Sequence, residues 1–421
     1  MNKKFWVGFF AGIAASTIIF SATFILYVNG GAWNHVKNGS IIRTSELNQK
    51  TSNNIESNGS ELQYHYSNDK KVLKIQTIID KYYLNKVTEE QIAEGVYKGI
   101  MGSLDDPYSV YYTKDEYNSI KASTSGTYCG IGAVVTQNVN TGVITIVRPY
   151  EDSPSAKAGI KTGDILYKVN GEEVTGVDLT QVVTKLKGEA GTQVEVTVVR
   201  EGEKDYLTFQ VERASIEVPS IEYEMLEDNI GYIIVTEFDE VTAKQFKNAL
   251  DDLEKQGIKG LIIDLRNNGG GVLSTAVDML DRMVGNGLLV YTEDKNGVDQ
   301  EYKAKSNESF DKPLVILVNK NSASASEVFS GAIQDYGIGK LVGTKTFGKG
   351  IVQSIISLDD ESAVKLTTSK YYTPKGRNIH ETGLEPDVKV ELNEKAEKKI
   401  TIKKEEDNQL QEGIKEIKKC F

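Results

Sequence analysis

Three alternating serines follow an apolar run and precede a helical pattern. The stretch runs from Val318 to Glu327 and reads VNKNSASASE. In one interpretation Ser324 is a helix cap, because Ser324 and Glu327 have capping-box spacing, in which the hydroxyl bonds to the helix's own N–H. In the other, Ser324 is a nucleophile at a helix N-terminus, where the dipole and the Ala325 N–H stabilise an oxyanion. This stretch alone leaves both open.

A lysine between two glycines is the second candidate. Lys349 lies in GTKTFGKGIVQ, residues 343–353, beside Phe347 and Ile351. An apolar setting removes water from the ammonium and lowers the pKa of a lysine, so Lys349 could serve as a general base. A solvated turn lysine is the plainer alternative. Gln353 follows on the same side of a predicted strand, where it could hold the amine or satisfy a backbone group.

A glycine run supplies backbone donors. Residues 264–271 read DLRNNGGG, after a buried-strand pattern and before a helical one. Free N–H groups collect at such a turn, but the spacing matches no common phosphate-binding motif. An anion hole for another developing negative charge fits equally well. His380 is the one histidine in the expected folded body, so a Ser-His-Asp triad would depend on it; a polar loop role is favoured for it.

The charge and the cysteine content of the chain exclude several classes of protein. The chain has 421 residues, with 49 basic against 60 acidic side chains and a net charge of −11. An acidic chain without a Lys/Arg block argues against nucleic acid as a partner. Two cysteines, Cys129 and Cys420, exclude a disulfide scaffold and a four-cysteine zinc site. Only three histidines occur, so we expect no His-rich metal centre. A serine nucleophile with a lysine base would need no metal and no organic cofactor.

The N-terminus has the pattern of a membrane anchor. Residues 5–28 carry no charge, and about 20 residues in a helix cross the hydrocarbon core. We predict a single transmembrane anchor within residues 1–30, uncleaved, because the apolar run lacks the exit of a signal peptide. Lys3 and Lys4 favour a cytoplasmic N-terminus. The expected location is the cell membrane, single-pass, with the catalytic part extracytoplasmic and residues 31–70 as a flexible tether.

Four further segments differ in their periodicity. Residues 71–124 have helical spacing, and Thr113 with Glu116 predicts a capping box. Residues 125–213 alternate short β-rich runs with glycine turns and predict a small, partly open β-barrel. Residues 214–393 alternate strand and helix patterns, which indicates a layered β/α core. Residues 394–421 predict a charged helical tail.

The β-rich segment resembles a PDZ domain. The similarity lies in the loop Gly130-Ile131-Gly132-Ala133 and in DSPSA, AGI, GDIL and VNG, which follow it in order between residues 152 and 171. In PDZ domains the first loop offers backbone N–H groups to a peptide's terminal carboxylate, and the peptide adds as a strand. A glycine-bearing β-turn without a ligand is the alternative.

Taken together, residues 71–390 resemble the carboxyl-terminal processing peptidases, also called tail-specific proteases. SASASE followed by FGKGIVQ is the most specific part; DDPY at 105–108, DLRNN with its glycines, and GLEPD at 383–387 occur in the family's order. The resemblance implies three catalytic residues, Ser324 as nucleophile, Lys349 as base and Gln353 as the residue that orients the lysine. It also implies that Gly270 and Ala325 form the oxyanion hole. Gly269 departs from the family, which usually has proline there.

The expected fold class is α/β, or α+β multidomain. It comprises a crotonase- or ClpP-like layered β/α protease core, implied by the resemblance, an inserted PDZ-like β-barrel domain, an N-terminal helical segment and a single transmembrane helix. The expected function is a membrane-anchored serine endopeptidase that uses a Ser-Lys dyad to cleave proteins near their free C-termini, while the PDZ domain binds the substrate's C-terminal tail. A homo-oligomer could form through 71–124 and 394–421. The alternatives are an inactive PDZ scaffold and a crotonase-type acyl-CoA enzyme, for which no nucleotide motif is present.

Overall fold

The computed structural model describes residues 69–306, 309–397 and 402–421. The predicted anchor, residues 5–28, and nearly all of the predicted tether lie outside the described residues. Within the described ranges, no helix combines the length and the apolar character needed to cross a membrane.

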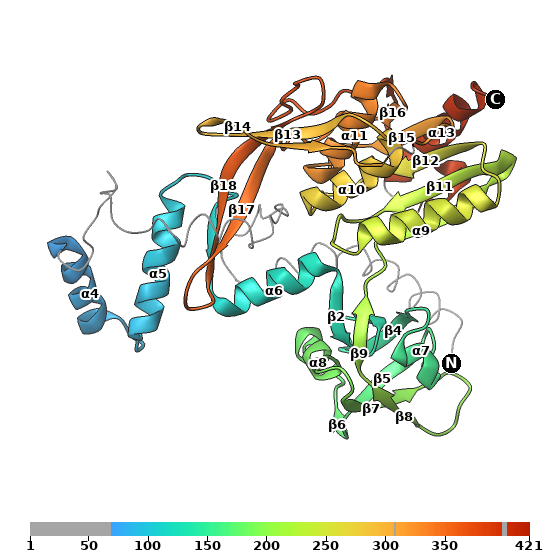
Figure 1. Cartoon of the computed structure of the whole chain (residues 1–421). Coiled ribbons are helices and arrows are strands. Elements are labelled where there is room, and N and C mark those ends of the chain that lie inside the picture. The colour runs from blue at the N-terminus through green and yellow to red at the C-terminus, as the bar shows by residue number, and fades with distance from the viewer. Residues whose placement is uncertain (1–68, 307–308, 398–401) are drawn as a thin grey trace.

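A six-stranded sheet forms the centre of the largest body (Figure 1). Its order is β10-β11-β12-β15-β16-β19; β10 is antiparallel to β11 and every other neighbouring pair is parallel. The strands are β10 (Ile221–Leu226), β11 (Ile230–Val235), β12 (Gly260–Asp264), β15 (Leu314–Val318), β16 (Lys340–Gly343) and β19 (Val388–Lys389).

Helices cover both faces of this sheet, which explains the unbroken apolar runs in its strands. Ile263 packs toward one group of helices, whereas its neighbour Ile262 packs toward the other face. The first face carries α9 (Thr242–Lys255), α10 (Leu273–Val284) and α11 (Ala325–Tyr336), and the second carries α13 (Asn408–Lys418). The predicted layered β/α core is therefore present.

A second, antiparallel sheet lies beside the core. Its order is β1-β18-β13-β14, and β17 also pairs with β18. The strands are β1 (Val110–Tyr112), β13 (Leu288–Asp294), β14 (Gly297–Lys303), β17 (Ile351–Ser357) and β18 (Ala363–Tyr372). This sheet joins the N-terminal segment to the core, because β1 and β17 both pair with β18.

The N-terminal helices extend from the rest of the molecule. They are α4 (Lys70–Tyr82), α5 (Glu89–Gly102) and α6 (Lys114–Ser125). The predicted capping box of Thr113 and Glu116 begins α6. Neither α4 nor α5 has a buried residue, and both project away from the core (Figure 1). The C-terminal segment adds α12 (Glu394–Glu397) and the short η3 (Lys404–Glu406), and η2 (Glu227–Asn229) joins β10 to β11.

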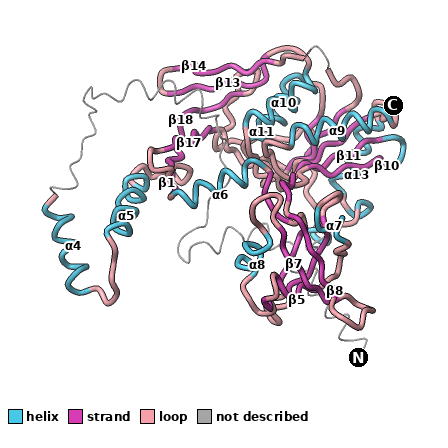
Figure 2. Tube along the Cα trace, turned by 60° about the horizontal axis from the view of Figure 1, so that its bottom comes forward, coloured by secondary structure: helices cyan, strands magenta, loops and turns pink. Residues whose placement is uncertain are grey.

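The PDZ-like body is inserted between α6 and β10 (Figure 2). The chain enters and leaves it through the antiparallel pair β2 (Thr127–Gly130) and β9 (Ala214–Glu217). The main sheet runs β3-β4-β5-β7-β8, with β6 on β5, so closure into a barrel stays a prediction. Its elements are β3 (Ala133–Gln137), β4 (Ile144–Pro149), α7 (Pro154–Ala158), β5 (Ile165–Val169), β6 (Glu172–Glu173), α8 (Leu179–Leu186), β7 (Gln193–Val199) and β8 (Leu207–Glu212).

Candidate active site

Ser324 occupies a strained position at the N-terminus of α11. Its φ is 56° and its ψ is −117°, which is outside the extended region that N-cap residues usually adopt. Such a backbone conformation costs about 1–3 kcal/mol in a residue other than glycine and occurs mostly at functional sites. The side chain is almost fully buried, at 2% exposure. The surrounding structure therefore fixes Ser324 in a conformation that it would not adopt alone.

The buried carboxylate of Glu327 joins the serine segment, residues 318–327, to the lysine segment, residues 343–353. Its Oε2 accepts hydrogen bonds from the backbone N–H of Ser324 at 2.9 Å and of Lys349 at 2.8 Å. Its Oε1 accepts from Thr346 Oγ1 at 2.6 Å and from Gly348 N at 2.8 Å. Burial raises the pKa of Glu327, and these four donors lower it in part. The bond to Ser324 N–H is the carboxylate half of the predicted capping box.

Tyr371 makes a second connection between the same two segments. Its hydroxyl lies 3.1 Å from the Ser324 carbonyl oxygen and 2.6 Å from the Lys349 carbonyl oxygen. The tyrosine belongs to β18 and is 2% exposed. The backbones of the two candidate catalytic residues thus share one carboxylate and one phenol.

The lysine is buried among aromatic and polar groups. Lys349 has no exposed surface, which excludes the solvated turn lysine, and its Nζ lies 4.6 Å from the centre of the Tyr108 ring. Gln353 is also fully buried. Its Nε2 donates to Thr367 Oγ1 at 3.2 Å, while its Oε1 has no partner among the described residues. An unpaired buried oxygen is costly, and it is available to accept a donor.

The glycine loop lies against the serine. A Cβ atom on Gly270 would be 2.8 Å from Ser324 Cβ and 2.9 Å from Ala325 N, so only glycine fits there. In this arrangement the Gly270 N–H donates to Asn268 Oδ1 at 2.8 Å. The geometry brings Gly270 and Ala325 together as predicted, but the Gly270 donor must leave Asn268 before it can serve an oxyanion.

Sequence reasoning assigned no role in this site to three of its buried side chains, those of Glu327, Asn268 and Tyr371. Glu327 had a signal, since its spacing from Ser324 is that of a capping residue. Asn268 lay within the glycine stretch, although nothing marked its bond to the Gly270 N–H. Tyr371 had no signal, because its hydroxyl reaches the site only through the pairing of β18 with β17. His380 lies on a loop that packs on the lysine segment, where Glu381 N donates to Gly348 O at 2.8 Å.

The predicted peptide-binding loop is fixed by a neighbouring turn. Gly132, with φ of 75°, accepts at its carbonyl from Ser155 Oγ at 2.8 Å and from Tyr150 N at 2.9 Å. Ser155 N also donates to the Ile131 carbonyl at 2.8 Å. Burial and nearby Tyr150 raise the pKa of Tyr128, while backbone hydrogen bonds from Ala133 and Gly132 lower it in part. The Tyr128 hydroxyl therefore faces the N–H groups expected to bind a carboxylate.

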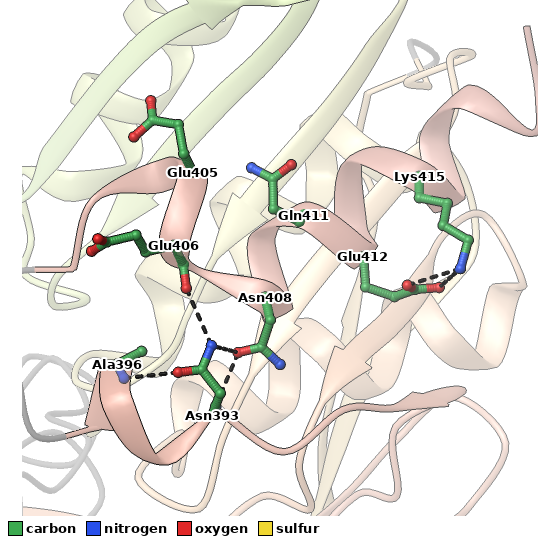
Figure 3. Close-up of a pocket in the computed structure, with 8 residues that line it drawn as sticks. All are labelled: Asn393, Ala396, Glu405, Glu406, Asn408, Gln411, Glu412 and Lys415. Carbon is green, nitrogen blue, oxygen red and sulfur yellow. Dashed lines mark hydrogen bonds and ion pairs between the residues drawn. The ribbon is translucent and has the colours of Figure 1, made fainter.

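A separate concave surface lies at the C-terminal segment (Figure 3). Its polar side chains bond to their own segment: Asn393 Oδ1 accepts from Ala396 N at 2.8 Å, and Asn393 Nδ2 donates to Asn408 Oδ1 at 3.2 Å. These contacts close the segment around α12 and α13. Across the described ranges, no cluster of three or more His, Cys, Asp or Glu side chains could hold a metal ion.

Comparison with known proteins identifies the class. Peptidase family S41 matches residues 229–390, the PDZ domain matches residues 145–200, and the activating protease CtpB N-terminal domain matches residues 25–116. The chain belongs to peptidase family S41, and it is a carboxy-terminal processing protease of the serine type.

Two Bacillus subtilis proteins are among its relatives. Carboxy-terminal processing protease CtpA is 38% identical over 323 residues, which cover 76% of this chain and 69% of the relative. Carboxy-terminal processing protease CtpB is 36% identical over 324 residues, covering 76% and 67%. The structure of a photosystem II D1 C-terminal processing protease is 30% identical, with a TM-score of 0.45, over 77% of this chain and 88% of the other.

Proposed function

We propose that this chain is a membrane-anchored endopeptidase that cleaves proteins near their C-termini with a Ser324–Lys349 dyad. One observation carries the proposal: the buried Glu327 carboxylate accepts hydrogen bonds from the backbone N–H groups of both residues. That contact supports the proposal because it ties the backbone of a buried serine and that of a buried lysine to one carboxylate. Such a pair suits nucleophilic catalysis, since a dehydrated lysine can act as the general base for a serine.

The proposed reaction is acyl transfer. Neutral Lys349 takes the Ser324 proton as the hydroxyl oxygen attacks the substrate carbonyl carbon, and a tetrahedral oxyanion forms. Ala325 N–H and Gly270 N–H donate to that oxyanion, the latter after leaving Asn268. The protonated lysine gives its proton to the leaving amine as the peptide bond breaks. Water then hydrolyses the acyl-enzyme. Gln353 Oε1 is the acceptor we assign to the lysine amine in the productive arrangement.

The PDZ-like body would supply recognition. Backbone N–H groups around Gly130–Ala133 form a nest that suits a terminal carboxylate. The tail would extend as a strand beside β3 and displace the Tyr128 hydroxyl from the loop.

Anchoring and assembly are further parts of the proposal. Residues 5–28 would fix the chain in the cell membrane, with the catalytic part extracytoplasmic. Large apolar side chains on α4 and α5 are exposed, among them Leu73, Ile75, Ile78 and Tyr97, and we assign them to contact with a second copy. Membrane fractionation with protease protection tests the first assignment, and light scattering of the full chain in detergent tests the second.

The dyad is tested with two alanine variants. Ser324→Ala and Lys349→Ala should each lower kcat/KM for an unstructured protein substrate by about 10³-fold or more, because residues that act as a unit fail together. Circular dichroism should remain that of the parent chain. A Lys349→Ala protein with near-normal turnover would rule the dyad out.

Matched controls exist in the same segments. Ser330 lies on α11, and its buried Oγ has no partner among the described residues, so Ser330→Ala removes a hydroxyl without breaking a bond. Lys345 precedes Lys349 in the same loop and is exposed in an ion pair with Glu385. Ser330→Ala and Lys345→Ala should both keep parental activity. If the parent chain itself leaves the substrate intact, the inactive PDZ scaffold becomes the better description.

A further inference from the structure

The turn Asp106–Ser109 lies between α5 and β1 and is held by its own side chains. Asp106 Oδ1 accepts from Tyr108 N at 2.9 Å, and Asp106 Oδ2 accepts from Ser109 Oγ at 2.6 Å. Ser109 is buried. These bonds close the turn and fix the direction in which the Tyr108 side chain leaves it.

The same turn is attached to β18, the strand that carries Thr367, the hydrogen-bond partner of Gln353. Thr367 N donates to Ser109 Oγ at 3.0 Å, and Thr367 Oγ1 accepts from Gln353 Nε2 at 3.2 Å. The pairing of Val110 with Lys365 continues this attachment along β18. One threonine therefore holds both the N-terminal turn and the proposed orienting residue.

The Tyr108 ring covers the amine of the proposed base. Lys349 Nζ lies 4.6 Å from the ring centre, within the range of a cation–π contact. The lysine is fully buried, whereas Tyr108 itself is half-buried and so lies toward the edge of the site. The strand β1 begins beside this turn and pairs with one edge of β18, while β17 pairs with the opposite edge. Figure 2 shows these three strands together. An N-terminal residue thus closes a site whose other members belong to the protease core.

The titratable groups around this lysine come from several elements. Asp106 and Tyr108 belong to the turn, Glu327 to α11, Tyr371 to β18, and His380 to the loop that packs on Gly350. Burial raises the pKa of Asp106, but hydrogen bonds from Ser109, Thr367 and Tyr108 and the positive charge of Lys349 bring it below its usual value. The lysine amine and the Asp106 carboxylate therefore interact.

We propose that Tyr108 is a positioning residue of the dyad, whose ring shields the Lys349 amine from water and holds it within reach of Ser324. The inference rests on the proposed role of Lys349 as the base. The ring has two opposing effects: contact with the π-face favours the ammonium, and exclusion of water favours the neutral amine. Exclusion of water has the larger effect, because burial lowers the pKa of a lysine by up to several units, whereas a cation–π contact raises it by about one.

The test is the pH profile of kcat/KM for the full chain with a fluorogenic unstructured peptide. In Tyr108→Ala water reaches the amine, so the acidic limb should move to higher pH by about one unit and activity at pH 7 should fall about tenfold. Tyr108→Phe keeps the ring and should retain the limb of the parent. Tyr206→Ala is the matched control, since Tyr206 is an exposed tyrosine of the PDZ-like body whose ring contacts that of Tyr167, at 4.7 Å between ring centres; its limb should not move.

A second measurement, chemical labelling of Lys349, does not depend on peptidase activity. In the Ser324→Ala background, the rate at which cyanate modifies Lys349 is compared by peptide mass spectrometry with that of exposed Lys345. The rates are measured over a pH series and compared on the alkaline plateau, where the amine is neutral with and without Tyr108 and the rate reports access alone. Adding Tyr108→Ala should there raise the Lys349 rate several-fold relative to Lys345. An unmoved limb, a limb displaced to lower pH, or an unchanged labelling ratio would each overturn the shielding role. Residual cleavage by Ser324→Ala would instead overturn the proposed function, while the labelling result would still decide the inference.

Discussion

The proposed dyad site and the proposed carboxylate-binding loop of the PDZ-like body use different chemical groups, side chains in the first and backbone amides in the second. The dyad site depends on side chains that are buried and aligned from α11, the lysine loop and β18. The loop Gly130–Ala133 depends on backbone amides, which one turn of the same body holds in place. A site made of side chains can be lost through a single distant residue. A site made of amides is sensitive mainly to backbone conformation and to what competes for the donors.

The largest loss of activity is expected from a substitution of Glu327, the side chain that joins the serine and lysine segments. Its four acceptor contacts need two oxygens, and Glu327→Gln would turn an NH₂ group toward backbone or hydroxyl donors. The serine and lysine segments should then separate, since a buried unsatisfied group costs about 1–3 kcal/mol. We expect kcat/KM to fall about 100-fold, because a displacement of about 1 Å at a catalytic group costs that much. Peptidase assays with thermal unfolding measure both.

Glu361→Gln provides the control for that substitution, because Glu361 is exposed and pairs with Lys114 on the surface. It should leave activity and stability near the parental values. Binding of a fluorescent tail peptide to the Glu327→Gln protein should also be unchanged, since the PDZ-like body does not contain Glu327. A variant with parental activity would mean that the shared carboxylate does not align the dyad.

The same contrast explains what could be predicted from the sequence. The strands β12 and β15 were predictable because sheets covered on both faces need uninterrupted apolar runs. The helix α6 followed from helical spacing and from the capping box of Thr113 and Glu116, which are local signals. The roles of Tyr371 and Thr367 were not predictable, because their contacts depend on how β18 pairs with β17. Residue types and order pointed to Ser324, Lys349 and Gln353, but the bond between Gly270 N–H and Asn268 required coordinates.

The second prediction addresses the loop of backbone amides. A substrate with an amidated C-terminus cannot present a carboxylate to the nest around Gly132, so its kcat/KM should be about tenfold lower, mostly through KM. We expect the Tyr128 hydroxyl to compete with the tail for these N–H groups, so Tyr128→Phe should strengthen binding of the acid tail. Steady-state kinetics of matched acid and amide peptides measure the difference. Equal rates for the two peptides would contradict carboxylate capture.

The smallest expected effect concerns Asp239, in a loop that touches both regions. Glu240 N donates to Thr124 O at 3.1 Å beside the entry to the PDZ-like body, and Phe238 N donates to Gly270 O at 3.0 Å in the glycine loop. Burial raises the pKa of Asp239 to about 7, and the charge of Glu237 adds to this. The folded state thus binds this proton more tightly than the unfolded chain, whose aspartate has a pKa of about 3.9.

The sign of the pH dependence follows from that difference. The stabilising contribution of Asp239 is complete below about pH 4 and is lost as the pH rises to about 7, where a buried carboxylate remains. Asp239→Asn removes that charge, so the variant should gain about 1 kcal/mol over the parent at pH 8 and little at pH 5. The full shift would correspond to about 4 kcal/mol, but partial solvation reduces it. Exposed Asp299→Asn is the control, and denaturant unfolding at both pH values is the measurement. A gain that is the same at pH 5 and pH 8 would mean that the charge at this junction does not destabilise the contact between the two regions.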